Sequence, residues 1–599
     1  MGEQCGEVVT LQLGHYASFV GTHWWNLQTA MRSSPLAQNV DLEICSDVLF
    51  RQGVTLRGLE TYTPRLILMD LKGSLDSLRE EGYLYEDKRT MRSTPGWRGI
   101  LTTHQEEPSQ RNPFLSDSEM PCSHRQEGAA FPQACSGVQD VKDGLTGNAG
   151  KSCTWEQRVN VWSDLLQTDL HMKSVCVINR YNHGGETDTL DSFGQGEALL
   201  KESCYLDDLE DRLHFFTEEC DYLQGFQVLC DLHNGFSGVG AQVAEFLRDQ
   251  YPGRGILTWG TSPVQPGEAD FRKRTFQMLN TIMGTVKMSS VSSLFCPLSL
   301  NSSLGRRPGV PTSLPHVLYD PVLPYHSSAI LALALETLTA PYRLRSSPLP
   351  MQHLAEALNT CGRKVVRAVA SLPFPIQAGS SLPDALLSHM TSAPWSSLTP
   401  CGTSGLSNPS NCFSQCVVLR GIRKDQQRSY QPRGARSLSV LHAQDTGPET
   451  LQCYLQSLYP QAVSVSHLLQ APCKLPSAFP QFFSPQVSKD GFIQLSERPK
   501  GVEHIPVLAA LQTSEDIHRL LNGLDEEVKK LDVRRFSTFF TTGVEQEDFE
   551  EALHQMQDLA QCYSDSRVLW PSSSPPGPTS APWLPPPRLS WWRIPLGIS

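Results

Sequence analysis

Residues 223–250 place the strongest constraint on what this chain can fold into. They read LQGFQVLCDLHNGFSGVGAQVAEFLRDQ, with Gly235, Gly238 and Gly240 between an apolar run and a helical pattern. The apolar run predicts a buried strand, and the apolar spacing after it predicts an amphipathic helix. A glycine-rich loop between a strand and a helix can hold a phosphate group, because loop N–H groups and the helix dipole favour an anion. A tight turn without a ligand explains the glycines equally well.

The residues around this stretch resemble tubulins. Residues 207–226 are similar to the helix and strand before the tubulin phosphate loop, and residues 234–240 stand where that loop reads Gly-Gly-Gly-Thr-Gly-Ser-Gly. Three more blocks are similar: VTLQLGHYASFVGTHWW near the N-terminus, PRLILMDLKG at 64–73, and residues 536–565. On these blocks the chain is identified as a member of the Misato branch of the tubulin/FtsZ superfamily.

This resemblance implies an α/β fold. We expect a tubulin/FtsZ-like, Rossmann-type nucleotide domain, a second α/β domain and C-terminal helices, at residues 1–85 with 153–345, 346–512 and 513–565. Residues 86–152 are rich in Ser, Pro, Gln and Gly. Such a segment cannot bury enough apolar surface to offset its chain entropy, so we predict a disordered insertion. Residues 566–599 form a Pro/Trp-rich tail, expected to be disordered or to bind a proline-recognition domain or a membrane interface.

Local patterns predict the individual elements. Apolar runs predict strands at 7–13, 66–71, 175–178 and 255–259. A sheet of this class binds ligands at the carboxyl ends of its strands. Further strands are expected at 364–371, 413–421 and 505–509, and helices at 155–166, 326–339 and 517–531.

Four candidate site residues lie at the ends of the first two predicted strands. Gly14 permits a close approach of the backbone, and His15 either donates to a phosphate or lies partly buried at the surface. Asp70 ends an apolar strand. Two positions later, where tubulin-like enzymes carry an acid that assists with magnesium and water, stands Lys72. A lysine cannot coordinate a cation, so Lys72 either neutralises a phosphate or lies in a solvated loop.

The resemblance implies GTP or GDP as the cofactor. Asn179 falls on a residue that contacts nucleotide in tubulins, Ser237 lies in the phosphate loop, and Asn280 matches an asparagine that reads the guanine edge. A second guanine-reading asparagine has no counterpart in residues 301–315, which leaves base specificity open.

No catalytic residue and no metal ligand is predicted. Tubulin and FtsZ supply an Asn-x-Asp loop to the nucleotide of the next subunit, and its carboxylate helps to activate water. The matching positions in this chain are Pro350, Met351 and Gln352, and no acidic residue lies between Pro341 and Ala355. Glutamine can at most orient a water molecule. Cys401, with the pair Cys412 and Cys416, lacks the second His or Cys pair of a zinc site.

The resemblance therefore implies a protein that is not an enzyme but a non-hydrolysing pseudo-GTPase. It would be cytoplasmic, peripheral at the mitochondrial outer membrane, and would govern mitochondrial distribution, morphology and fusion. Partners would be proteins of the outer membrane or the fusion machinery, with tubulin or its chaperones as alternatives. A second hypothesis is an active, self-assembling GTPase in microtubule or spindle organisation, and a third is a scaffold that binds no nucleotide.

Charge, apolar run length and cysteine spacing limit the classes of protein and partner that we expect. The net charge is −12 and the pI is about 5.8, which gives no electrostatic reason to expect a nucleic acid. The longest apolar run, 329–335, is far shorter than the roughly 20 residues that cross a bilayer, so we predict no transmembrane segment. The 17 cysteines show no framework spacing and are expected to be reduced.

Overall fold

The computed structural model describes residues 6–33, 43–54, 60–75, 78, 159–185, 187–265, 270–307, 309–401, 412–428, 439–494, 501–541 and 543–564. The described residues up to 564 belong to one compact unit. The predicted insertion at 86–152 and the predicted tail at 566–599 lie outside the described residues. The domain boundaries proposed from the sequence stay predictions.

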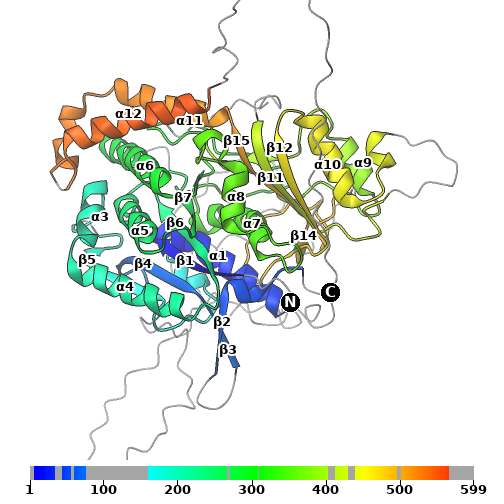
Figure 1. The fold of residues 1–599 in the computed structure, drawn as a ribbon, viewed down its shortest axis with the longest axis horizontal. Helices are drawn as coiled ribbons and strands as arrows, with labels where there is room; N and C mark the ends of the chain where they lie inside the picture. Colours follow the sequence, from blue (N-terminus) through cyan, green and yellow to red (C-terminus); the bar gives the residue numbers. More distant parts are fainter. Residues whose placement is uncertain are drawn as a thin grey trace, which may run out of the picture. The chain divides into compact units, whose positions relative to one another are not determined.

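Within the described residues, six parallel strands form the first sheet, in the order β5–β4–β1–β6–β7–β8 (Figure 1). They are β1 (Glu7–Leu13), β4 (Leu66–Lys72), β5 (Val175–Asn182), β6 (Leu223–Asp231), β7 (Gly255–Thr261) and β8 (Leu294–Leu298). Strands buried on both faces read as continuous apolar runs, which is why they could be recognised from the sequence. The predicted α/β fold class is confirmed.

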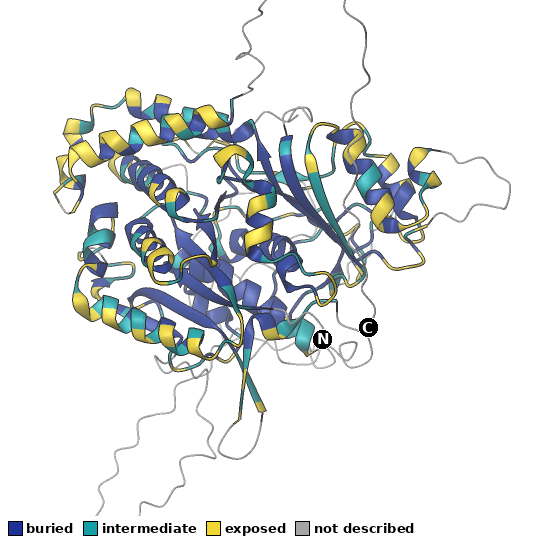
Figure 2. Cartoon of the chain, in the orientation of Figure 1, coloured by how far each residue is buried: buried dark blue, intermediate teal, exposed yellow. Residues whose placement is uncertain are grey.

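Helices cover both faces of this sheet. One face packs against α3 (Phe193–Leu200), α4 (Ser203–Glu218), α5 (Phe236–Gln250) and α6 (Phe271–Val291), with α11 (Asp516–Lys529) and α12 (Gln546–Cys562) outside them. The other face packs against α1 (His15–Arg32) and α7 (Pro324–Leu338). The outward faces of α4, α11 and α12 carry many exposed residues (Figure 2).

A second, mixed sheet lies on the far side of α1 and α7. In the described chain its order is β10–β9–β15–β11–β12, and only β11 and β12 pair in parallel. Its other face packs against α9 and α10. The bounds are β9 (Arg367–Ser371), β10 (Ser396–Ser397), β11 (Cys412–Arg420), β12 (Val463–Leu469), β15 (Val507–Ser514), α8 (Met351–Leu358), α9 (Leu382–Leu387) and α10 (Gly447–Leu458). Two short antiparallel pairs complete the described strands: β2 (Phe50–Val54) with β3 (Glu60–Pro64), and β13 (Cys473–Lys474) with β14 (His504–Ile505).

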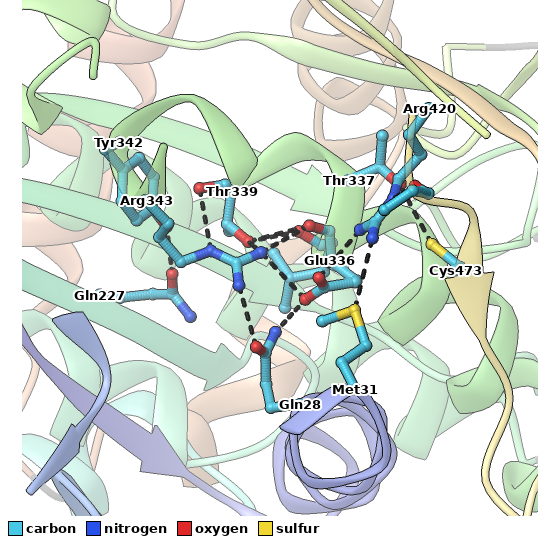
Figure 3. A network of polar contacts seen from close by, with 12 residues as sticks. Gln28, Met31, Gln227, Glu336, Thr337, Thr339, Tyr342, Arg343, Arg420 and Cys473 are labelled. Carbon is cyan, nitrogen blue, oxygen red and sulfur yellow. Dashed lines mark hydrogen bonds and ion pairs between the residues drawn. The ribbon is translucent and has the colours of Figure 1, made fainter. Parts of the chain in front are cut away.

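Helix α7 is buried all round, from Tyr325 to Leu338. An apolar helix of this kind belongs between two layers rather than at a surface. Its carboxylate, Glu336, is fully buried and pairs with Arg343 from the adjoining 3-10 helix η6 (Ala340–Arg343) and with Arg420 at the end of β11 (Figure 3). Gln28 of α1 also donates to Glu336. This ionic network joins α1, α7 and the second sheet.

Three segments differ from the local prediction. The helical spacing of 155–166 predicts an α-helix, but the described part forms only a 3-10 helix, η5 (Trp162–Leu165). The Asp164 carboxylate accepts the N–H groups of Asn160 and Val161 and so satisfies the backbone where η5 begins. Pro506 divides the strand predicted at 505–509 into β14 and β15, since proline has no N–H to donate. Residues 536–565 are similar in sequence to the last two helices of tubulins, but their described part contains one α-helix, α12, preceded by the irregular 3-10 helix η10 (Val533–Phe539).

The C-terminal helix is tied to the linker between the two sheets by one hydroxyl group. Tyr563, next to the end of α12, accepts from the Val365 N–H at 2.7 Å and donates to the Val365 carbonyl at 2.8 Å. Both residues are fully buried. The tyrosine therefore satisfies two backbone groups that water cannot reach.

We predict that Tyr563→Phe lowers the free energy of unfolding by about 1–3 kcal/mol, because both Val365 groups lose their partner. Urea unfolding followed by tryptophan fluorescence measures the change. Tyr222→Phe is the control, because Tyr222 is 60% exposed and its change should be close to zero. Equal stability of the two variants would contradict the contact.

Among the helices that the structure describes, none combines the length and the apolar character needed to cross a membrane.

Candidate functional site

The strand order places a possible ligand site between β1 and β6. The chain runs from β1 outward to β4 and β5, then returns to β6 on the other side of β1. In open α/β sheets ligands bind at such a switch point, beyond the carboxyl ends of the strands. Leu13 pairs with Cys230 at this end, so the next residues, Gly14 and Asp231, meet at the switch point.

The Asp231 side chain caps the first helix. Its carboxylate accepts the Ala17 N–H at 2.8 Å, the Tyr16 N–H at 3.1 Å and the Thr261 hydroxyl at 3.0 Å. Burial raises the pKa of Asp231 above its ordinary value, and the nearby His233 and these donors offset only part of that shift. Donors nevertheless face both carboxylate oxygens, as a buried carboxyl group requires.

The N–H groups of residues 235–239, in the glycine-rich loop and the first turn of α5, are already used within the chain. Gly235 donates to the Leu190 carbonyl at 3.0 Å, and Phe236 donates to the Asn234 side chain at 2.9 Å. Ser237 donates its N–H and its hydroxyl to the Asn234 carbonyl, at 3.1 and 2.8 Å. The N–H groups of Gly238 and Val239 turn back to the Gly235 carbonyl. A phosphate cradle would need these donors to face outward.

The glycines themselves serve helix packing. Gly238 and Gly240 lie inside α5, which begins at Phe236. A Cβ atom on Gly238 would lie 2.0 Å from the Phe193 carbonyl of α3, and one on Gly240 would lie 2.4 Å from the Cys230 sulfur. A Cβ on Gly235 would lie 2.7 Å from Leu190. Small residues here let α3 and β6 approach α5, so the packing explanation of these glycines is the one that the geometry supports.

A second buried carboxylate lies close by, at the end of β4. Asp70 accepts from His15 Nδ1 at 3.0 Å, from the Trp162 indole at 2.8 Å and from the Leu71 N–H at 2.8 Å. The His15 ring stacks on His183, with centroids 3.7 Å apart. Burial opposes ionisation, but His15 and the donors together hold the pKa of Asp70 below its ordinary value.

That shift predicts an acid-dependent stability. A carboxyl with a lower pKa in the folded state stabilises the fold above its unfolded pKa of about 3.9 and loses this contribution as pH falls towards the folded pKa. We expect the difference in unfolding free energy between wild type and Asp70→Asn to shrink as pH is lowered from about 5 to about 3. Urea titrations across this range measure it. A difference independent of pH would contradict the ionised Asp70.

Comparison with known proteins assigns the chain to a family. A family model described as "Misato Segment II tubulin-like domain" matches residues 6–119, and one described as "Tubulin domain" matches residues 152–344. "Protein misato homolog 1" of Bos taurus is 49% identical over 577 residues, and that of Mus musculus is 48% identical over 567 residues, in both cases with 94% of this chain and 99% of the relative covered. The chain belongs to the Misato family. "Protein misato" of Drosophila melanogaster is 28% identical over 582 residues, also with 94% and 99% covered.

The other predicted site residues of this Misato-family chain do not converge on one ligand position. Lys72 is exposed at the end of β4, as expected for a solvated lysine. Asn179 is exposed within β5, where the pairing with β4 is irregular between Leu71–Ile178 and Lys72–Asn182. The sequence predicts a strand that ends at Ile178, with Asn179 in the loop after it. This prediction is wrong, because β5 continues to Asn182.

Asn280 has a structural role. It lies mid-helix in α6, buried, and its Oδ1 accepts the Phe193 N–H at 2.7 Å. Its Nδ2 donates to the carbonyls of Asp191 at 2.7 Å and His233 at 3.3 Å. The side chain thus ties the start of α3 to the glycine-rich loop, and every polar atom of its amide has a partner. The prediction that Asn280 reads a guanine edge does not agree with these contacts.

Tubulin domains generally bind GTP, so the fit of a guanine nucleotide can be tested against these residues. It fails on two counts. Two buried carboxylates, Asp231 and Asp70, lie at the carboxyl ends of β6 and β4, the edge where sheets of this class bind ligands, and the N–H groups of residues 235–239 are used within the chain. In the sequence, Asp231 interrupts the apolar run before the glycine-rich loop, but no site role is predicted for it, nor for Thr261 or Trp162. The interruption was the available signal, because a buried carboxylate needs donors.

Proposed function

We propose that this chain is a tubulin-like protein that works by binding other proteins and does not hydrolyse GTP. Its proposed role is to regulate mitochondrial distribution, morphology and fusion, recruited from the cytoplasm to the mitochondrial outer membrane. Membership of the Misato family supports the mitochondrial part, through the role that the family resemblance implies. Partners are proteins of the outer membrane or fusion machinery, with tubulin or its chaperones as further candidates.

The observation that carries the non-hydrolysing part concerns the segment from η6 into the first turn of α8. In tubulin and FtsZ the matching loop supplies a carboxylate, but residues 341–355 contain none. Met351 is buried at the start of α8 and donates its N–H to Gln224 Oε1 at 2.7 Å. Gln352 is exposed, and its amide donates to Glu356 within the same helix at 3.1 Å. An amide cannot take a proton from an attacking water, so general-base catalysis has no group here.

A turnover assay with the purified full chain tests this part. We expect no GTP hydrolysis above background at any protein concentration, and the same result for Gln352→Ala. Losing general-base and metal assistance together removes several powers of ten in rate. Turnover that rises with protein concentration and disappears in Gln352→Ala would favour the alternative of a self-assembling GTPase.

Complementation in cells tests the mitochondrial part. Depletion of the protein is expected to disturb the mitochondrial network, and both wild type and Gln352→Ala should restore it. In a fractionation experiment, the protein should remain with mitochondria in buffer without carbonate and be released by alkaline carbonate, as expected for a peripheral protein. An intact network together with disordered spindle microtubules would instead support a cytoskeletal role.

A further inference from the structure

The N-terminus of α1 carries its own anion. Asp231 is fully buried, and its two oxygens accept the N–H groups of Tyr16 and Ala17 in the first turn of the helix. These N–H groups have no partner within a helix, and together with the helix dipole they favour a negative charge. The anion that satisfies them in this chain is a side chain from the neighbouring strand.

The conformation of Gly14 is explained by the same carboxylate. Gly14 has φ 108°, a left-handed region that favours glycine. A Cβ atom at Gly14 would lie 2.6 Å from Asp231 Oδ2 and 2.7 Å from its Cγ. The glycine thus makes room for Asp231, and the close backbone approach predicted for a phosphate is taken by this side chain.

The site also holds Asp231 firmly. Thr261, at the end of β7, donates its hydroxyl to Oδ1 at 3.0 Å, and Asn234 Nδ2 lies 3.4 Å from Oδ2. The donors come from α1, β7 and the glycine-rich loop, so they converge on one carboxylate. A phosphate at the same place would have to displace Asp231 or lie beside it, and two like charges in a buried site repel strongly.

We infer that Asp231 is an intramolecular substitute for a nucleotide phosphate at the switch point of this sheet. The fold is therefore complete without a guanine nucleotide, and the chain does not bind one tightly. This inference deepens the proposed function, because absence of hydrolysis then follows from absence of binding. It does not depend on the mitochondrial role.

The wild-type protein gives the first test. Full-length chain purified without added nucleotide is denatured and its small molecules are separated by chromatography. Thermal unfolding is then measured with and without GTP, GDP and inorganic phosphate. We expect no stoichiometric nucleotide and no change in Tm, because a ligand that does not bind the folded state cannot stabilise it. Co-purified guanine nucleotide, or a Tm that rises with GTP or GDP, would overturn the inference.

Substitution gives the second test. Asp231→Ser removes the carboxylate and leaves the Tyr16 and Ala17 N–H groups open, so we expect a lower Tm that inorganic phosphate or GDP raises in part. Asp164→Ser is the matched control, because Asp164 is a buried carboxylate that also accepts two backbone N–H groups, from Asn160 and Val161. Its Tm should fall without any response to phosphate. A folded Asp231→Ser protein that gains no phosphate response contradicts the inference.

The outcomes separate this inference from the proposed function. Nucleotide binding without turnover would overturn the inference and leave a non-hydrolysing protein in place. Turnover would overturn both. If Asp231→Ser does not fold, Asp231→Asn keeps the shape without the charge, and the wild-type measurements decide the question by themselves.

Discussion

Glu336→Gln is expected to lower the free energy of unfolding by about 3–5 kcal/mol, the largest effect of any single substitution considered for this chain. The Glu336 carboxylate lies 2.9 Å from Arg343 and 3.0 Å from Arg420 (Figure 3). All three side chains are almost fully buried. Glutamine keeps the shape but removes the charge, which leaves two guanidinium groups without a counter-charge from this position.

The remaining contacts of the two arginines do not replace that charge. Arg343 donates to Gln28 Oε1 at 3.0 Å and to the Thr339 hydroxyl at 2.9 Å. Arg420 donates to the Ala471 carbonyl at 3.3 Å. Neutral acceptors satisfy hydrogen bonds, but a buried cation without an opposite charge is costly. Because the network joins α1, α7 and β11, its loss should loosen the contact between the two sheets.

Guanidinium chloride unfolding followed by tryptophan fluorescence measures this effect. Asp211→Asn is the control, since Asp211 and its partner Lys173 are 77% and 37% exposed and 3.4 Å apart. An exposed pair of this kind changes stability by no more than about 0.5 kcal/mol. Similar midpoints for Glu336→Gln and the wild type would mean that the buried network contributes little.

Gly238→Ala is expected to lower the free energy of unfolding by about 1–3 kcal/mol or more. The added Cβ would lie 2.0 Å from the Phe193 carbonyl oxygen and 2.7 Å from the Glu197 nitrogen. Both are backbone atoms of α3, which cannot move as a flexible side chain can. Gly196 of α3 is equally close, since a Cβ there would lie 1.8 Å from the Gly235 carbonyl.

A helical glycine elsewhere provides the matched control. Gly523 lies inside α11 and has no atom within 4 Å of the place where its Cβ would be. Gly523→Ala should stabilise the protein by up to about 1 kcal/mol, because alanine favours the helix. Opposite signs for the two variants in urea titrations would confirm the close α3–α5 contact, and equal shifts would contradict it. A bulky residue at Gly238 therefore disturbs packing and is no clean probe of ligand binding.

Much of the fold could be predicted because its signals are local. The strands of the parallel sheet are apolar runs, α7 is an apolar stretch of helical length, and the strand, loop and helix of residues 223–250 are marked by their own glycines. Each of these patterns lies within one short stretch of the sequence. The candidate site was harder, because its residues were assigned one by one from family likeness while their partners lay elsewhere.

The distances along the chain show why. Asp70 was singled out correctly as a residue at the carboxyl end of a strand, but its partner Trp162 is 92 positions away. Asn280 takes its backbone partners from Phe193, 87 positions earlier, and from Asp191. No periodicity or motif predicts such pairs. In the sequence, a polar residue at the end of a strand is the same whether its side chain contacts a ligand or another segment of the chain.

The sequence by itself determined three features: the class of the sheet, the place of the glycine-rich stretch at its carboxyl edge, and the lack of a carboxylate at residues 341–355. Each of these depends only on residues that are close together in the chain. Only the tertiary structure decided what meets that edge. Asp231 and the helix that it caps are 215 positions apart, and only folding brings the charge and the open N–H groups within hydrogen-bonding distance.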